Sequence, residues 1–217
     1  MTPKELLRMS KCHRKAAELH KGVVYGAGAN MFDQVTRTAA LLHTTSSLAG
    51  RERTDAICAA LLHKCFEKNR IAEGQKPLTQ QEIIDLAGEK VAAVIDELRS
   101  EPPEKKNQTK TEQWQEKAAW AKTLSPAARE ILLAEKIVNF ETSRDDPNKQ
   151  KALSWHIEYF KTRMLMVEAI KDTNPALYKE AVAVKDAGLK KLKAPVRKLG
   201  AELKLIAKIK NINVHGE

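Results

Sequence analysis

Apolar residues recur along this chain at intervals of three and four, the spacing that places them on one face of an α-helix. Ala, Leu, Lys and Glu dominate, and no stretch alternates apolar and β-branched residues with the period of a strand. We therefore predict an all-α protein, a compact bundle of about eight to ten helices. Thr79 and Glu82 mark one helix start as a capping box. The predicted helices cover 2–20, 31–48, 53–66, 79–87, 89–100, 126–145, 148–171 and 175 onward.

Glycine and proline mark the expected breaks between these helices. The segments GVVYGAGAN (22–30) and EPPEKKNQTK (101–110) are predicted as loops, and we expect the last helix to be interrupted near Gly188 and Pro195. The segment AICAALLHKCF (56–66) is the most apolar, so it is predicted to be the central buried helix.

The positive charge is concentrated near the C-terminus. Of a net charge of +10, residues 185–210 contribute +7, because nine Lys or Arg stand against Asp186 and Glu202. Apolar residues between Leu192 and Ile209 are spaced at threes and fours and require a partner surface, either the body of the protein or another chain. We predict a helical domain over 1–184 and a basic helical extension over 185–217. A protein partner or a nucleic acid would contact this extension at 185–210.

Two features favour a cytoplasmic protein. No apolar run reaches the 18 or more residues typical of a membrane span, and MTPKELLRMSKCHRK has no apolar core after its charges. Cys12, Cys58 and Cys65 are scattered, which predicts reduced thiols and neither a disulfide framework nor a zinc ribbon.

Four segments, in order, are similar to the hydrolase domain of the RelA/SpoT family. AICAALLHKCFEKN (56–69) resembles its histidine-aspartate (HD) motif, and Gly88-x-x-Val91-x-x-Val94 resembles the segment that follows. LSPAAREILLAEKIVNF (124–140) and Glu158-Tyr159-Phe160 with the later DTNPAL resemble the last two. The resemblance implies an HD-domain fold. Family members remove the 3′-pyrophosphate of (p)ppGpp with a manganese ion.

The resemblance implies a divalent metal site whose ligands are here incomplete. His63 matches the motif histidine, and Glu135 stands where the family has an aspartate ligand. The first ligand histidine has no counterpart, and Asp33 and Gln34 are nearest to its position. His63, Glu135 and Gln34 are therefore the candidate ligands for Mn²⁺ or another divalent ion, if the site is functional. The alternative is that no metal is bound.

Two lysines replace acidic residues of the motif. Lys64 follows His63 where the family has an aspartate, and Lys68 follows Glu67 in the same way. Glu67 and Lys68 thus occupy the positions of the catalytic pair. Charges 4 Å apart interact by roughly 4 kcal/mol at an effective dielectric of 20, so an ammonium group there repels a metal ion. For the same reason the pocket becomes more favourable for an anion.

The resemblance also implies substrate-binding positions for a nucleotide or another phosphate-containing small molecule. These positions are Lys64, Lys136, Asn139, Tyr159 and Trp155, the last standing where the family has a basic residue.

Each of these residues also has a structural interpretation. His63 would be a core histidine, Glu135 would pair with Lys64 or Lys68, and Lys64 would extend to solvent from a rotated helix. Tyr159 and Trp155, four apart on one helix face, would be a core pair. His13, His20 and His43 lack partners at ligand spacing and are predicted to be surface or packing residues.

Three functional hypotheses follow. The first is a degenerate HD domain, impaired in catalysis, which binds a nucleotide such as (p)ppGpp or a protein partner in a regulatory role. The second is an active phosphohydrolase with a rewired metal site that uses His63, Glu135, Glu67 and Asp33. The third is a nucleic-acid-binding or assembly protein that acts through 185–210, ranked last because no helix-turn-helix signature is present.

Overall fold

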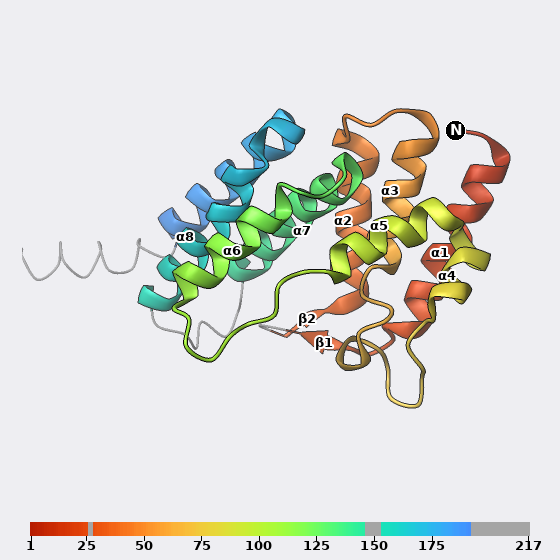
Figure 1. The fold of residues 1–217 in the computed structure, drawn as a ribbon, viewed down its shortest axis with the longest axis horizontal. Helices are drawn as coiled ribbons and strands as arrows, with labels where there is room; N and C mark the ends of the chain where they lie inside the picture. The colour runs from red at the N-terminus through yellow and green to blue at the C-terminus, as the bar shows by residue number, and fades with distance from the viewer. Residues whose placement is uncertain (26–27, 146–152, 192–217) are drawn as a thin grey trace, which may run out of the picture.

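The computed structural model describes residues 1–25, 28–145 and 153–191, and this part of the chain is almost wholly helical (Figure 1). The α-helices are α1 Pro3–Leu19, α2 Met31–Thr45, α3 Gly50–Leu62, α4 Gln80–Ala87, α5 Glu89–Arg99, α6 Lys110–Ala121, α7 Pro126–Asp145 and α8 Leu153–Ala169. Residues 175–191 form a further helix, and Lys68–Arg70 and Lys171–Thr173 are the 3-10 turns η1 and η2. The predicted all-α bundle is confirmed.

Helix α3 is the centre of the bundle. It contacts α1, α2, α5 and α7, and its residues from Thr54 to Leu62 are all buried. Small side chains such as Ala59 and Ala60 let the surrounding helices approach closely, while Leu61 and Leu62 fill the space between them. The prediction that this segment is the central buried helix is confirmed, although the helix ends at Leu62 and the residues after it turn.

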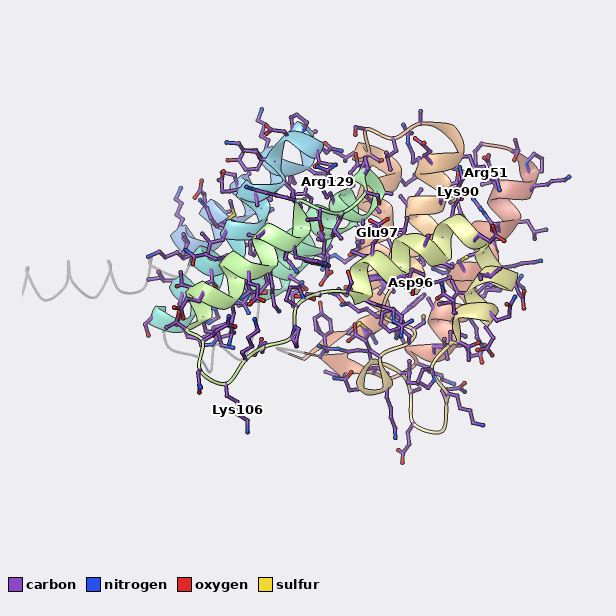
Figure 2. The ribbon with its side chains drawn as sticks, in the orientation of Figure 1. Arg51, Lys90, Asp96, Glu97, Lys106 and Arg129 are labelled. Atoms are coloured by element: carbon purple, nitrogen blue, oxygen red, sulfur yellow. The ribbon has the colours of Figure 1, made fainter. Side chains whose placement is uncertain are left out.

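Helix α7 joins the two halves of the molecule. It contacts α2, α3 and α5 on one side and α8 on the other (Figure 1). Its start is fixed by the predicted Ser125-Pro126 signal and by a bond from α5, because the Ser125 N–H donates to Glu97 Oε2 at 2.6 Å. Figure 2 shows Glu97 on α5, and Lys106 extending outward from the 101–110 loop.

Helix α6 was not among the predicted helices. It lies beside α8, with which it makes extensive contact (Figure 1). Its first turn carries a complete capping box, since Thr109 and Glu112 exchange side-chain and backbone bonds as Thr79 and Glu82 do at α4. This signal was present in the sequence and would have located the helix.

The glycine-rich segment 22–30 contains two short paired strands. Val24–Tyr25 (β1) pairs antiparallel with Ala29–Asn30 (β2), so a minimal hairpin stands where only a loop was predicted. Asn30 then caps α2 by accepting from the N–H groups of Phe32 and Asp33. The hairpin brings Tyr25 close to α7.

The expected interruption of the last helix at Gly188 is wrong, because residues 175–191 are continuous. Gly188 is buried against α8, and a Cβ atom there would lie 2.9 Å from Phe160 Cζ. The absence of a side chain at Gly188 therefore allows the 175–191 helix to pack closely against α8. Residues 185–191 continue the helix that begins at 175, whereas Pro195 and the rest of the basic extension lie outside the described residues.

Cys12, Cys58 and Cys65 are buried free thiols, as predicted. Within the described ranges, no helix has both the length and the apolar character that crossing a bilayer requires. The cytoplasmic location stays a prediction.

Candidate functional site

His63 lies at the C-cap of α3, where the chain leaves the buried helix. Its ring is 2% exposed, and its Nδ1–H donates to the carbonyl of Ala60 at 2.8 Å. This bond leaves Nε2 directed at Glu135, whose Oε2 atom is 3.6 Å away, slightly beyond hydrogen-bond distance. The motif histidine and the ligand-position glutamate are thus brought together across α3 and α7.

Glu135 is a buried carboxylate held among cations. Lys136 Nζ is 3.6 Å from its Oε1 atom, and Asn139 Nδ2 donates to the same oxygen at 3.3 Å. Burial alone would raise the pKa of Glu135, but Lys136, Lys64 and His63 outweigh this and hold the pKa well below its ordinary value. Glu135 is therefore ionised at neutral pH, and its charge is compensated by protein groups.

Lys64 turns into the site. Its side chain is 19% exposed, and its Nζ atom lies 3.1 Å from Glu67 Oε1. Burial acts to lower the pKa of Lys64, but the carboxylates of Glu135 and Glu67 reverse the effect and raise it. A permanent positive charge consequently stands beside Glu135, at the position that the resemblance assigns to an aspartate ligand.

The two lysines of the motif have different surroundings. Glu67 lines the same pocket as Lys64 and also approaches Arg70 at 3.5 Å. Lys68 begins the turn η1, is exposed, and is not among the residues that line the pocket. The catalytic role predicted for Lys68 therefore has no geometric support, because the chain turn after His63 directs this side chain outward.

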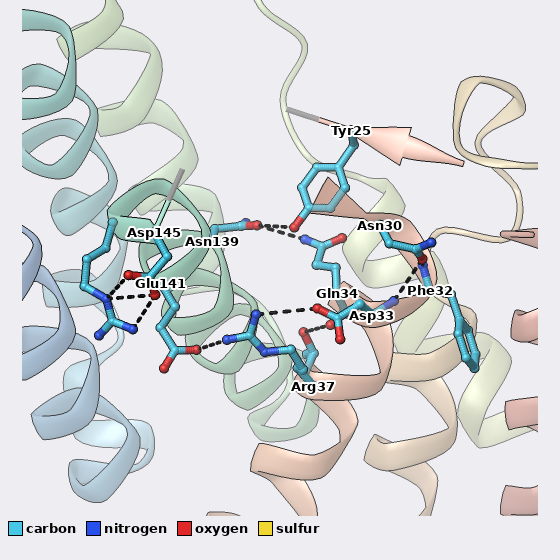
Figure 3. A network of polar contacts seen from close by, with 11 residues as sticks. Tyr25, Asn30, Phe32, Asp33, Gln34, Arg37, Asn139, Glu141 and Asp145 are labelled. Atoms are coloured by element: carbon cyan, nitrogen blue, oxygen red, sulfur yellow. Dashed lines mark hydrogen bonds and ion pairs between the residues drawn. The ribbon is translucent and has the colours of Figure 1, made fainter. Parts of the chain in front are cut away.

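Gln34 is connected to the site through Asn139. Its Nε2 atom donates to Asn139 Oδ1 at 3.0 Å, and the Tyr25 hydroxyl donates to the same oxygen at 3.4 Å (Figure 3). Burial raises the pKa of Tyr25 to about 12, so this hydroxyl keeps its proton at neutral pH. Asn139 in turn donates to Glu135. The predicted residues Gln34, Asn139 and Glu135 thus form one chain of hydrogen bonds.

Asp33, the other candidate at the missing ligand position, is directed away from this chain. It is exposed and pairs with Arg37 at 3.5 Å, and Arg37 also contacts Glu141 on α7 (Figure 3). Asp33 is therefore a surface residue of α2.

Aromatic side chains of α8 lie near Glu135. Tyr159 and Trp155 stack with ring centroids 5.1 Å apart, and the Arg163 guanidinium lies 4.0 Å from the Tyr159 ring centre. The same guanidinium lies 4.6 Å from the ring centre of Trp114 on α6. Trp114 was missed because α6 was not predicted. Arg163 was overlooked although it follows Tyr159 by four residues on the predicted helix, the same spacing that separates Trp155 from Tyr159.

The pocket lined by His63, Lys64 and Glu135 has a volume of about 330 Å³. Its wall comes from the end of α3, the end of α5 with the loop after it, α6 and α7. Charged groups of both signs line it beside His63, including Lys64, Glu67, Glu101, Lys117 and Glu135. Of the two predicted ammonium groups only Lys64 lines this pocket, together with Lys117, which was not predicted. Each of these two is already close to a carboxylate, since Lys64 pairs with Glu67 and Lys117 with Glu101.

The donor set does not fit a hard divalent ion. His63 Nε2 and Glu135 Oε2 are placed as two ligands, but the described residues contain no group of three or more His, Cys, Asp or Glu side chains suited to a metal. Manganese and magnesium prefer several oxygen ligands. Here the next charged groups are the ammonium ions of Lys64 and Lys136, which repel a cation.

No protein-family model matches the sequence, and no curated protein matches it either. A solved structure described as "A metazoan ortholog of SpoT hydrolyzes ppGpp and plays a role in starvation responses" matches with a TM-score of 0.65 and 19% sequence identity. The match covers 84% of this chain and 96% of that chain. At this identity the likeness establishes the architecture. The chain therefore shares the fold of this SpoT-like protein, in agreement with the fold that the resemblance of its motifs implied.

Proposed function

We propose that this protein is a degenerate HD-fold hydrolase that binds a nucleotide such as (p)ppGpp without metal-dependent turnover and acts in regulation. The single observation that carries the proposal is the position of Lys64. Its ammonium group is beside Glu135 and Glu67, so a fixed monovalent cation compensates the carboxylates that would otherwise attract a metal ion.

The surrounding chemistry supports a phosphate-containing ligand. Lys64, Arg99 and Lys117 line a pocket of about 330 Å³, within the range of small-molecule sites. Glu67 and Glu101, the carboxylate partners of Lys64 and Lys117, are 30% and 38% exposed, so these side chains have room to release the ammonium groups to a ligand. Tyr159 and Trp155 provide a stacked aromatic pair, with Tyr159 near Glu135.

Hydrolysis and binding of (p)ppGpp by the full chain, measured separately, test the proposal. We expect saturable binding, negligible turnover and little manganese in the purified protein. Lys64→Gln should weaken binding by about tenfold or more, because a charge-assisted contact is lost. The exposed neighbour Lys68 offers a matched control, and Lys68→Gln should change affinity less than about threefold. Stoichiometric manganese with rapid turnover, or equal effects of the two substitutions, would contradict the proposal.

A second function is favoured by one specific contact. Because Nδ1 of His63 donates to Ala60, the lone pair of a neutral ring is on Nε2, facing Glu135 at 3.6 Å as two metal ligands would. In this alternative the protein is an active phosphohydrolase with a rewired metal site. Loss of both manganese and turnover in His63→Ala would support it.

A further inference from the structure

Three cationic side chains from three helices converge on the indole ring of Trp114. Lys117 Nζ lies 5.1 Å from the ring centre, Lys136 Nζ 5.5 Å and the Arg163 guanidinium carbon 4.6 Å. We call these four residues the Trp114 cluster. The ring itself is only 7% exposed, so the charges gather around a largely buried surface.

The carboxylates near the Trp114 cluster do not fully neutralise its three positive charges. Lys136 shares Glu135 with Lys64, and Lys117 pairs with Glu101. Arg163 has no carboxylate at ion-pair distance within the described chain, and Glu104 and Glu158 act on its charge only from farther away. Its Nη1 donates to Thr162 Oγ1 at 3.0 Å, and its side chain also hydrogen-bonds Tyr159.

Arg163 is held chiefly by stacking between Tyr159 and Trp114. Burial lowers the pKa of Arg163, which reflects the cost of keeping this charge out of water. Cation–π contacts return only about 0.5–2 kcal/mol each. A partly buried cation cluster of this kind is stabilised further by an anion, and a guanidinium is suited to bind phosphate oxygens in pairs.

Glu101 occupies the place that such an anion would take at Lys117. Its Oε1 atom lies 2.7 Å from Lys117 Nζ, and both residues line the pocket. The Lys117 side chain is 12% exposed, whereas Glu101 is 38% exposed and begins the loop that continues through Pro102 and Pro103. The carboxylate can therefore turn to solvent more readily than the ammonium group can.

We propose that the Trp114 cluster is a binding subsite for a phosphate or diphosphate group, and that the Glu101 carboxylate competes with this group for Lys117. The inference rests on the proposed function for its nucleotide. Lys117 is the member of the cluster that lines the pocket shared with Lys64, so a phosphate-containing ligand in that pocket would meet the cluster at Lys117.

Calorimetry of the full chain with inorganic diphosphate tests the subsite directly. Arg163→Gln and Lys117→Gln should each weaken diphosphate binding by about tenfold or more, as expected for a lost charge-assisted contact. Glu101→Gln should strengthen binding by about threefold to tenfold, because it removes the competing charge. Lys122→Gln, at the exposed C-cap of α6, is the matched control and should leave affinity unchanged. Thermal unfolding of each variant establishes that it is folded.

The Glu101 variant decides the matter even if Arg163→Gln fails to fold, because a merely structural Glu101 would not raise affinity when neutralised. Unchanged or weaker diphosphate binding in Glu101→Gln would overturn the inference. Nucleotide binding that depends on Lys64 but on neither Lys117 nor Glu101 would also overturn it, while leaving the proposed function intact. Diphosphate binding that depends on Lys117, in a protein that binds no (p)ppGpp, would support the subsite and refute the proposed function.

Discussion

Replacing Lys64 with methionine removes the cation that compensates two carboxylates of the site, and we expect the folded protein to lose stability. The Lys64–Glu67 distance is 3.1 Å. The gross attraction at this distance is about 5 kcal/mol at an effective dielectric of 20, most of which is offset by desolvation. Lys64 is 19% exposed, and Glu135 remains paired with Lys136 in the variant. We therefore expect the substitution to lower the free energy of unfolding by about 1–2 kcal/mol at pH 7.

The pH dependence of this stability cost tests whether it arises from the charge interaction between Lys64 and Glu135. The folded-state pKa of Glu135 lies below its ordinary value, so its contribution to stability is complete above the unfolded-state pKa and is lost as the pH falls through the folded-state pKa. The raised pKa of Lys64 keeps its own contribution complete at neutral pH, with loss only at strongly alkaline pH. The cost of Lys64→Met should therefore be largest near pH 7 and shrink as the pH falls below about 4.3.

Urea unfolding at several pH values measures this cost, and the chain offers a matched control. Lys15 and Glu18 form an ion pair of the same i,i+3 spacing at 3.2 Å, with side chains 31% and 52% exposed. Lys15→Met should cost less than about 0.5 kcal/mol. Equal costs for the two substitutions, or a Lys64→Met cost that does not change between pH 7 and pH 3, would refute the reasoning.

Three further outcomes are expected. Lys64→Asp should raise manganese affinity in calorimetry by placing a third donor beside the histidine and glutamate of the site, whereas adding Lys68→Asp should give no further gain because that side chain is exposed outside the pocket. Gly188→Ala should lower stability in thermal unfolding by about 1–3 kcal/mol through its clash with the buried Phe160 ring, despite the better helix propensity of alanine. Glu130→Ala should cost about 3–5 kcal/mol in urea unfolding, because this fully buried carboxylate accepts four hydrogen bonds, from two serines and an asparagine.

The pairing of His63 with Glu135 could be anticipated from the sequence, because the family resemblance aligns both positions. Its geometry required the fold, since the two residues lie on α3 and α7, and the ring orientation depends on the bond to Ala60. The same holds for Lys64 and Lys68. They are equivalent in the sequence, yet the turn that begins η1 leaves one in the pocket and directs the other to solvent.

The sequence by itself determined the helical class, the buried central helix and most helix boundaries, because periodicity and caps are local properties. Only the tertiary structure decided which charges meet. Trp114 lies on α6 and Arg163 on α8, and no local pattern relates the two. The role of Gly188 depends likewise on its distance to Phe160. Packing between segments far apart in the chain sets such contacts, so they cannot be read from the spacing of residues within one segment.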